Sequence, residues 1–371
     1  MKNIHYGDIH TKFSTLFDIT KERVPFISDY QTIERIKSDN YCIEGDIVFA
    51  DASEDLDDVG KSIEIVNLNN ERLLSGLHTL LARQIESKLI VGFGGYLFKS
   101  NGIRRAIKKI AHGAKVLGIS ARRLSGIDIC FPTDKLEQQK IADCLSSLEH
   151  LITTQSQKLG ALEIHKKGLM QQLFPAEGES VPGLRFLEFR DSLEWEEKIL
   201  KNVCKMQAGK FISASEIYEK TATGLFPCFG GNGLRGFTKT FTHNGTYSLI
   251  GRQGALCGNV KLAVGKFHAT EHAIVVTPFN SINLYWLYYE LIRLNLNQFA
   301  IGQAQPGLSV ETLGKLIVKL PEDELEQQKI ADCLSSLEEL ISAQKRKLEV
   351  LKIHKKGLMQ GLFPAVDTGQ E

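Results

Sequence analysis

Three glycine-rich loops in the second half of the sequence hold the side chains best suited to specific hydrogen bonding. These loops are GGNGLRG from Gly230, GRQG from Gly251 and GQAQPG from Gly302. They present six amide or guanidinium side chains: Asn232, Arg235, Arg252, Gln253, Gln303 and Gln305. Arginine can donate two hydrogen bonds to guanine, and asparagine or glutamine can exchange two with adenine. Loops carry binding residues more often than frameworks do, so we expect contacts with bases here, with an ordinary surface loop as the alternative for each residue.

Comparable polar loops occur in the first half of the chain. HYGDIHTK, residues 5–12, offers Tyr6, His10 and Lys12, and HGAKVLG, residues 112–118, offers Lys115. The second of these loops aligns with GQAQPG when the two halves are superposed by an offset of 189 residues. These four side chains are therefore candidates for the same kind of contact.

Basic charge is concentrated in one stretch of each half. Residues 87–127 contain nine lysines and arginines and no acid, and residues 220–270 contain six and no acid. The net charge is only +1, because residues 44–58 carry seven acids and no base. Basic surfaces neutralise phosphates, so we expect a polyanion contacted twice and add Arg104, Arg105 and Arg122 to the candidate DNA-binding residues. The alternative is a solvated basic face.

No combination of residues indicates catalysis or a metal site. VGKS, residues 59–62, resembles the end of a P-loop, but Asp55 stands where that motif requires glycine. Amino-methyltransferase motifs contain a Pro-Pro dipeptide, and this chain has none. His78 and His272 are interpreted as structural. Seven cysteines without a CxxC pair predict neither a disulfide framework nor a zinc site. With no signal peptide and no apolar run near the ~20 residues of a membrane span, we expect a cytoplasmic protein without a membrane partner.

One segment, LEQQKIADCLSSLE, occurs twice, beginning at Leu136 and at Leu325. Extended without a gap, residues 136–175 and 325–364 agree at 31 of 40 positions. Proline stands before and after each copy and not inside it. Each copy is therefore predicted to form one long helix, roughly 60 Å long at 1.5 Å per residue.

Apolar residues recur along each predicted helix at alternating spacings of four and three, the pattern of a coiled coil. The predicted interface residues are Ile141, Leu145, Leu148, Ile152, Leu159 and Leu162 in the first copy, and Ile330, Leu334, Leu337, Ile341, Leu348 and Leu351 in the second. Polar layers at Gln155 and Lys166, and at Gln344 and Lys355, are expected to fix the register. The alternative is an amphipathic helix packed on its own domain. Shared residues also predict a common outer face for two copies of one partner: Gln138, Lys140, Lys166 and Lys167, repeated as Gln327, Lys329, Lys355 and Lys356.

The predicted fold class is α+β (mixed α/β), with two similar globular domains and two long helices in an antiparallel coiled coil, related by an internal pseudo-twofold repeat. Short β-type runs (GDIVFA, IEIVNL, TYSLIG and HAIVVTP) accompany one helical run, LYWLYYELIRLNL. The predicted segments are residues 1–134, 135–176, 181–321 and 322–364. Residues 181–200, VPGLRFLEFRDSLEWEEKIL, have no counterpart before MKNIHYGDIH. Three explanations stay open: a late start of the first domain, a different opening strand or descent from a truncated frame. The boundary of the first domain and its contacts near residues 6–12 therefore stay undetermined by the sequence.

The chain resembles a specificity (S) subunit of a type I restriction–modification system over essentially its whole length. The resemblance is carried by the repeated segments Pro132–Ala142 and Pro321–Ala331, the HKKGLMQ-x-LFP ends of both helices and EFRDSLEWEEKIL. In that family two target-recognition domains each read one half of a bipartite, asymmetric site in double-stranded DNA. The coiled coil sets the spacing and docks two modification (methyltransferase) subunits, which bind S-adenosylmethionine. Restriction subunits join the full complex and use ATP and Mg²⁺. The resemblance implies a non-catalytic DNA-recognition subunit with no cofactor of its own.

Other readings of the residues stay open. A coiled-coil interaction scaffold with basic globular domains would show no preferred DNA sequence, and a single-chain methyltransferase or nuclease would need motifs that are missing. Within the resemblance, the chain could serve a restricting system or one that only methylates. The residues do not determine the half-site sequences, the spacer length or which loop residues read bases.

Overall fold

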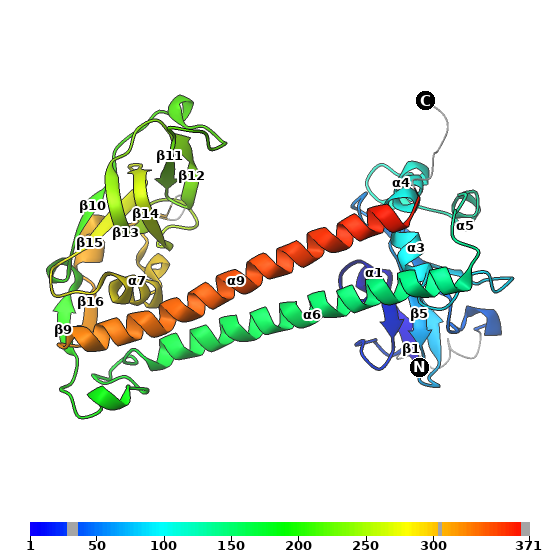
Figure 1. The fold of residues 1–371 in the computed structure, drawn as a ribbon, viewed down its shortest axis with the longest axis horizontal. Coiled ribbons are helices and arrows are strands. Elements are labelled where there is room, and N and C mark those ends of the chain that lie inside the picture. The colour runs from blue at the N-terminus through cyan, green and yellow to red at the C-terminus, as the bar shows by residue number, and fades with distance from the viewer. Residues whose placement is uncertain (28–35, 303–305, 365–371) are drawn as a thin grey trace. The chain divides into compact units, whose positions relative to one another are not determined.

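The structure, a computed structural model, describes residues 1–27, 36–302 and 306–364 (Figure 1). The chain divides into two compact units. The first comprises Met1–Ser156 and Arg346–Glu371, and the second comprises Gln157–Lys345. Each long helix therefore contributes residues to both units, and the four-segment division stays a prediction. In the described ranges no helix is long and apolar enough to cross a membrane.

The first unit is built on a four-stranded sheet of order β2-β5-β3-β7. The strands are Leu16–Asp18, Ser62–Asn67, Ile47–Ala50 and Thr79–Ala82. All four residues of β3 are buried, as expected for a strand with a neighbour on each side. The described part of the unit also has two short ladders: β1 (Lys2–Ile4) with β6 (Leu73–Ser75), and β4 (Ala52–Ser53) with β8 (Leu117–Gly118).

Short α-helices among the described residues of this unit are α1 (Tyr6–Thr11), α3 (Gly94–Lys99), α4 (Asn101–Ile110) and α5 (Ala121–Leu124). The start of α3 meets β5 through Glu64, whose carboxylate accepts hydrogen bonds from the backbone N–H of Gly92 and Gly95 at 2.9 and 2.6 Å. Burial raises the pKa of Glu64 to about 7. Ile103 and Ile107 of α4 are buried in the same hydrophobic cluster as Leu145, so the beginning of the first long helix belongs to the core of this unit.

The second unit contains a six-stranded sheet of order β10-β15-β13-β14-β11-β12. The strands are Cys204–Ala208, Ala273–Pro278, His243–Gly251, Val260–Ala269, Phe226–Gly230 and Gly233–Thr238. A two-stranded ladder joins β9 (Glu196–Ile199) to β16 (Ile317–Leu320). The aromatic helix α7 (Leu284–Arg293) buries Trp286 completely in the main core, and the short helix α8 spans Val310–Gly314.

The two repeated segments form the long helices α6 (Lys135–Gln172) and α9 (Glu324–Leu362). In the second unit, Glu163 of α6 contacts Lys345 of α9, and Lys166 contacts Glu338. Residue numbers rise along α6 while they fall along α9, so the helices run antiparallel in that unit.

The predicted α+β fold class is confirmed. The runs GDIVFA, IEIVNL, TYSLIG and HAIVVTP lie in or at β3, β5, β13 and β15, and LYWLYYELIRLNL contains α7. Because the four runs alternate or concentrate β-branched and aromatic residues between turn residues, their strand character was visible in the sequence.

Candidate nucleic-acid interface and paired helices

A hollow of about 440 Å³ in the second unit collects polar side chains from separate loops. Asn232 lies in the turn between β11 and β12, Arg235 lies on β12, and Gln253 follows β13; all three are exposed and line the hollow. These are three of the six residues predicted from the glycine-rich loops. Their donors and acceptors surround a single concave surface, which is the arrangement that recognition of a planar polar group requires.

Glycine allows these loops to approach one another. A Cβ atom on Gly251 would lie 2.0 Å from the carbonyl oxygen of Gly231, closer than two such atoms can come. Only a residue without a side chain fits at this position, so the pairing of GGNGLRG with GRQG is fixed by backbone contact.

The other three candidates from the glycine-rich loops are Arg252, Gln303 and Gln305. Arg252 is half-buried, and its backbone N–H and C=O bond to His272 and Leu308. Gln303 and Gln305 lie outside the described residues. Just after them, the Pro306 carbonyl accepts a hydrogen bond from the Gly254 N–H at 2.9 Å, so the third loop returns to the edge of the GRQG loop.

His272 also lines the hollow, which the sequence did not predict. Its ring Nε2 lies 3.1 Å from a carboxylate oxygen of Glu271. His272 stands directly before β15. The sequence gave no reason to place its ring beside Gln253.

In the first unit, the basic candidates fall into two groups. Arg104 of α4 is half-buried, and its guanidinium donates to the carbonyl oxygens of Asp57 and Val59 at 3.1 and 2.8 Å. Burial lowers the pKa of Arg104. One carbonyl partner, Asp57, belongs to the acidic segment and the other, Val59, follows it directly, so this arginine is held mainly by its own domain.

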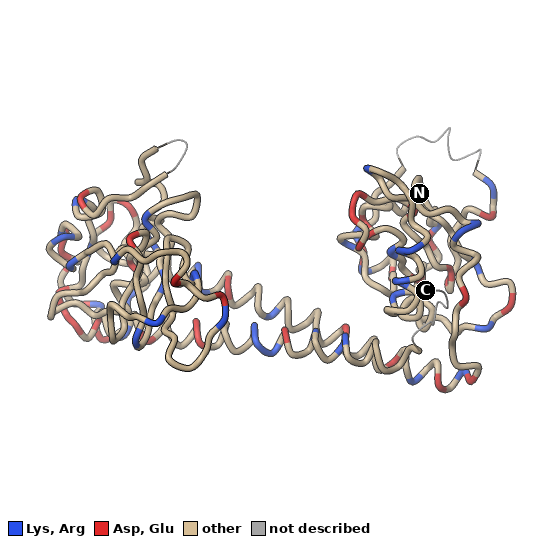
Figure 2. The backbone as a smooth tube through the Cα atoms, turned by 90° about the horizontal axis from the view of Figure 1, so that it is seen from above, with Lys and Arg blue, Asp and Glu red and all other residues tan. Residues whose placement is uncertain are grey.

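Arg105, Lys115 and Arg122 are exposed instead. Arg105 lines a shallow hollow of about 520 Å³ together with Arg104, Lys108 and, from α9, Lys356. Arg122 lies on α5 and Lys115 in the loop before β8, so they extend the basic character beyond this hollow. Figure 2 shows basic positions along much of this unit with acidic ones interspersed, and the Lys108 ammonium contacts the carboxylate of Asp57.

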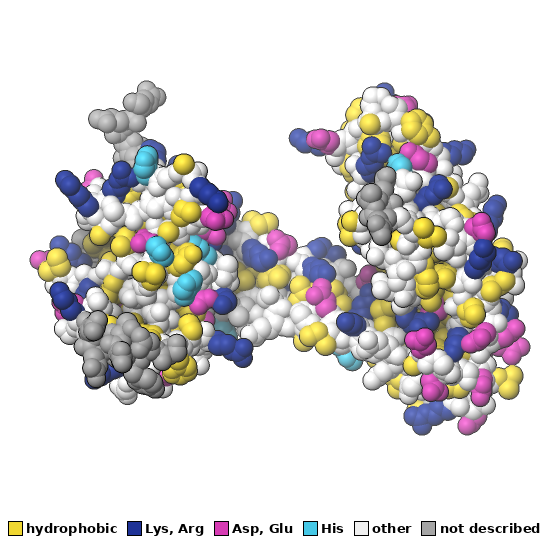
Figure 3. All heavy atoms as spheres, turned by 180° about the vertical axis from the view of Figure 1, so that it is seen from behind, with side chains coloured by type: hydrophobic (Ala, Val, Ile, Leu, Met, Phe, Trp, Pro, Cys, Tyr) yellow, Lys and Arg dark blue, Asp and Glu magenta, His cyan; other side chains and the backbone are white. Residues whose placement is uncertain are grey.

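HYGDIHTK, predicted as a loop, is mostly helical: Tyr6 and His10 lie on α1, and Lys12 is the residue that caps its C-terminal end. The ring of Tyr6 is 5.7 Å from that of His10 and 5.5 Å from that of His78, both edge to face. Burial lowers the pKa of His10, and Lys12 is exposed and paired with Asp8 at 2.6 Å. Figure 3 shows histidine rings gathered on one face of this unit. The structure thus brings Tyr6 and His10 together in an aromatic cluster and leaves Lys12 at its edge.

The predicted helix-interface residues all lie buried or half-buried. In the first unit these are Ile141, Leu145, Leu148 and Ile152 of α6 with Leu348 and Leu351 of α9; in the second they are Leu159 and Leu162 of α6 with Ile330, Leu334, Leu337 and Ile341 of α9. The interface residues nearest the start of each helix also belong to the cores of the globular domains: Ile141 and Leu145 in α6, and Ile330 and Leu334 in α9. The alternative of a helix packed on its own domain therefore describes the start of each helix.

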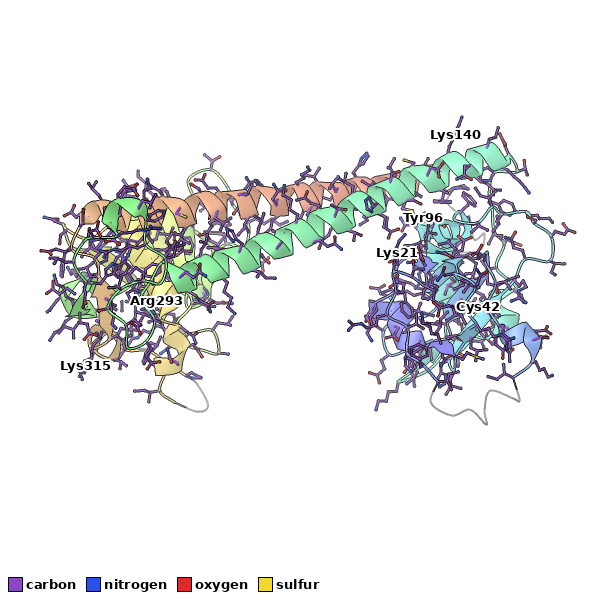
Figure 4. The ribbon with its side chains drawn as sticks, turned by 90° about the horizontal axis from the view of Figure 1, so that it is seen from below. Lys21, Cys42, Tyr96, Lys140, Arg293 and Lys315 are labelled. Atoms are coloured by element: carbon purple, nitrogen blue, oxygen red, sulfur yellow. The ribbon has the colours of Figure 1, made fainter. Side chains whose placement is uncertain are left out.

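A repeated contact that the sequence did not predict ties each helix pair to its domain. In the first unit Tyr96 donates to Glu149 at 2.9 Å, and Lys355 bonds to the same carboxylate at 2.9 Å. In the second unit Tyr289 donates to Glu338 at 3.0 Å, and Lys166 bonds to it at 3.0 Å. Figure 4 shows Tyr96 directed toward the paired helices. The polar layers predicted at Lys166 and Lys355 are thus ion pairs with the opposite helix.

The prediction that Gln138 and Gln327 belong to an outer face is wrong. Gln138 is fully buried: it donates to the carbonyl oxygens of Lys88 and Pro132 and accepts from the Ile90 N–H at 2.9 Å. Gln327 repeats this arrangement with the carbonyls of Ser281 and Pro321 and the N–H of Asn283. Both amides satisfy loop backbone that would otherwise be buried without partners, and this accounts for their identity in the two copies.

The chain is similar in sequence to known specificity proteins of type I restriction systems. Residues 192–352 match the family model of the type I restriction modification DNA specificity domain. The specificity subunit of the Escherichia coli type I restriction enzyme EcoprrI is 48% identical over 139 residues, 37% of this chain and 35% of that protein. The MjaVIII specificity subunit of Methanocaldococcus jannaschii is 27% identical over 297 residues, 72% of this chain and 69% of that protein.

A solved structure, the type I restriction–modification S subunit from M. genitalium, superposes with a TM-score of 0.67 at 18% identity, covering 98% of this chain and 92% of the other. A chain from a structure of an assembled type I restriction–modification system superposes with a TM-score of 0.54 at 16% identity, covering 87% and 82%. The duplicated frame of globule and helix therefore has the fold of DNA-specificity subunits. The sequence matches make residues 192–352 similar to the type I restriction modification DNA specificity domain, and the superpositions show that the chain shares the fold of solved type I S subunits.

Proposed function

We propose that this chain selects the DNA sequence on which a type I restriction–modification complex acts, with each globular domain reading one half of a bipartite site. The observation that carries the proposal is the hollow in the second unit. Asn232 and Arg235 of the β11–β12 hairpin and Gln253 of the loop after β13 converge there, and Gly251 allows the two segments to make close backbone contact. Amide and guanidinium groups held in this way can distinguish base edges, whereas scattered surface lysines could only neutralise phosphates.

The first domain would read the other half-site with a different set of residues. Its exposed Arg105, Lys115 and Arg122 suit phosphate contacts, and Tyr6 and His10 offer an aromatic and hydrogen-bonding surface. The two domains share little sequence outside the repeats, which fits two half-sites of unlike sequence. The bipartite site would accordingly be asymmetric.

The helices would act as the spacer and as the docking surface for two modification subunits. Lys140 and Lys167 are exposed in the first copy, as are Lys329 and Lys356 in the second, so the same basic positions are available twice. A pseudo-twofold frame offers a pair of identical partners equivalent sites. S-adenosylmethionine would be bound by those modification subunits, and ATP and Mg²⁺ by restriction subunits where the system has them.

Methylome sequencing of cells that express this chain with a cognate modification subunit tests the proposal. The expected result is methylated adenine in one bipartite motif with an unspecified central gap, absent when this chain is omitted. A matched control replaces Gln253 by alanine and should alter the motif in one half only. Methylation that does not depend on this chain, or that follows a continuous motif, would contradict the proposal.

A further inference from the structure

In the second unit, residues 185–199 cover the start of α9. Arg185 donates through Nε and Nη2 to the two carboxylate oxygens of Glu326, at 2.8 and 2.7 Å, and Trp195 donates to the same carboxylate at 3.4 Å. Glu188 pairs with Lys329 at 3.1 Å. Glu326 is only 1% exposed as a result.

The same segment supplies a strand. β9 pairs antiparallel with β16, from Ile317 opposite Ile199 to Leu320 opposite Glu196. Val318 and Leu320 are buried beneath it, at 0% and 4% exposure. Three features thus receive residues 185–199: a strand edge, a glutamate and a lysine.

The first unit repeats the glutamate and the lysine, and it has an extended stretch without strand pairing where the second unit has β16. Ser120 and Ser309 cap the short helices α5 and α8 in the same way, and Gln138 and Gln327 bind the carbonyls of Pro132 and Pro321. Between these matched points, residues 128–131 correspond to β16. Glu137 corresponds to Glu326, and Lys140 to Lys329.

No described segment of the first unit covers these residues as residues 185–199 cover their equivalents. Ile129 is 38% exposed, where its equivalent Val318 is buried. Glu137 and Lys140 are exposed, and Figure 4 shows Lys140 projecting from α6. Among the described residues, the backbone groups of residues 128–131 form no hydrogen bond with another part of the protein. Within the same ranges, neither Glu137 nor Lys140 has an ion-pair partner.

Two mainly apolar hollows flank residues 128–131. One, of about 420 Å³, is lined by Leu89, Ile129 and Phe131 among others, and the second, of about 380 Å³, by Leu80, Ile103 and again Ile129. Ala82 and Phe98 also line both. In the second unit Trp195 is buried beside the corresponding ladder, so the hollows are suited to an aromatic side chain of an incoming segment.

We infer that the first unit binds an extended polypeptide segment from another chain, one with the chemistry of residues 185–199. That segment adds a strand along residues 128–131, donates an arginine to Glu137, presents an acid to Lys140 and buries an aromatic ring beside Ile129. The second unit provides the template, because its identical repeat already holds such a segment. Strand addition supplies backbone hydrogen bonds, and the charged and aromatic contacts supply specificity.

A fluorescein-labelled peptide of residues 181–200 is the probe, titrated into the full chain and followed by fluorescence anisotropy. We expect saturable binding at micromolar peptide. Glu137→Lys in the protein should weaken it about 10- to 100-fold, the value of a hydrogen-bonded contact with a charged group, and the Arg185→Glu peptide should restore binding to that variant. Glu219→Lys, the same charge change at an exposed residue of the second unit, should leave binding unchanged.

Binding that is insensitive to Glu137→Lys would overturn the inference, because the peptide would then be displacing residues 185–199 from the second unit. Absence of saturable binding would overturn it as well. Sedimentation of the chain alone identifies the donor. Self-association that Glu137→Lys abolishes would make a second copy the source of the segment, whereas a monomer that binds the peptide would make it a different partner chain.

Discussion

Replacing Glu326 by alanine should destabilise the second unit strongly, while the same change at Glu137 should do almost nothing. The two glutamates occupy the same position in identical repeats. Glu326 is buried with a bidentate arginine, and Glu137 is exposed. The comparison therefore holds sequence and helix position constant and varies only tertiary surroundings.

The magnitude follows from what the change leaves behind. Arg185 keeps hydrogen bonds to the carbonyls of Ser192 and Leu193, but its side chain is 7% exposed and its charge would lose the only carboxylate it pairs with among the described residues. Removing one partner of a buried ion pair costs about 3–5 kcal/mol. For a domain of 150–250 residues this corresponds to a fall in Tm of roughly 6–20 °C.

Intrinsic fluorescence reports this unit selectively. The chain has two tryptophans, Trp195 and Trp286, and both are buried in the core of the second unit. Urea or thermal unfolding followed by tryptophan emission should therefore shift in Glu326→Ala, and far-UV circular dichroism should show whether the first unit follows. Glu137→Ala should leave both signals unchanged.

Two results would refute the reasoning. Equal shifts in the two variants would mean that helix position, rather than burial, sets the contribution of this residue. A negligible shift in Glu326→Ala would mean that the Arg185 pair adds nothing beyond the packing of Trp195 around it. An Arg185→Ala and Glu326→Ala double mutant then measures the coupling between the two charges.

Three further outcomes are expected. Burial raises the pKa of Glu64 from its ordinary 4.5 to about 7. Its contribution to the stability of the first unit is therefore fully present below about pH 4.5, and the free energy of unfolding falls by about 3 kcal/mol as the pH rises through 7. Urea titrations at pH 5 and pH 8 should show a smaller difference in Glu64→Gln than in the unchanged chain, and an equal difference would contradict the assignment. Gln253→Ala should weaken binding to the cognate DNA by about 1–3 kcal/mol and relax one half-site, with Lys239→Ala as a phosphate-type control; an equal loss on all DNA sequences would make Gln253 a backbone contact. Charged residues at both Leu148 and Leu337 should separate the helices, and retention of the same spacer length in the recognised motif would argue against their role as the spacer.

The sequence by itself determined the frame of this protein. Two copies of a helix with apolar residues at four and three spacings, bounded by proline, predict two long paired helices because that periodicity places one continuous stripe on each helix surface. Runs such as GDIVFA and HAIVVTP, bounded by turn residues, predict strands for the same local reason. The identical segments also carried the family resemblance.

Tertiary structure decided what equivalent residues do. Gln138 and Gln327 are polar, and a sequence pattern assigns polar residues to the surface, yet both are buried because loops distant in sequence present backbone groups to them. Glu137 and Glu326 are identical in sequence and opposite in environment, because only the second unit has residues 185–199 over it among the described residues. The hollow with Asn232, Gln253 and His272 likewise depends on loops brought together by sheet pairing and by the close contact at Gly251. Long-range contacts of this kind leave no periodic trace in the chain, so residue type and spacing could suggest the chemistry but could not place it.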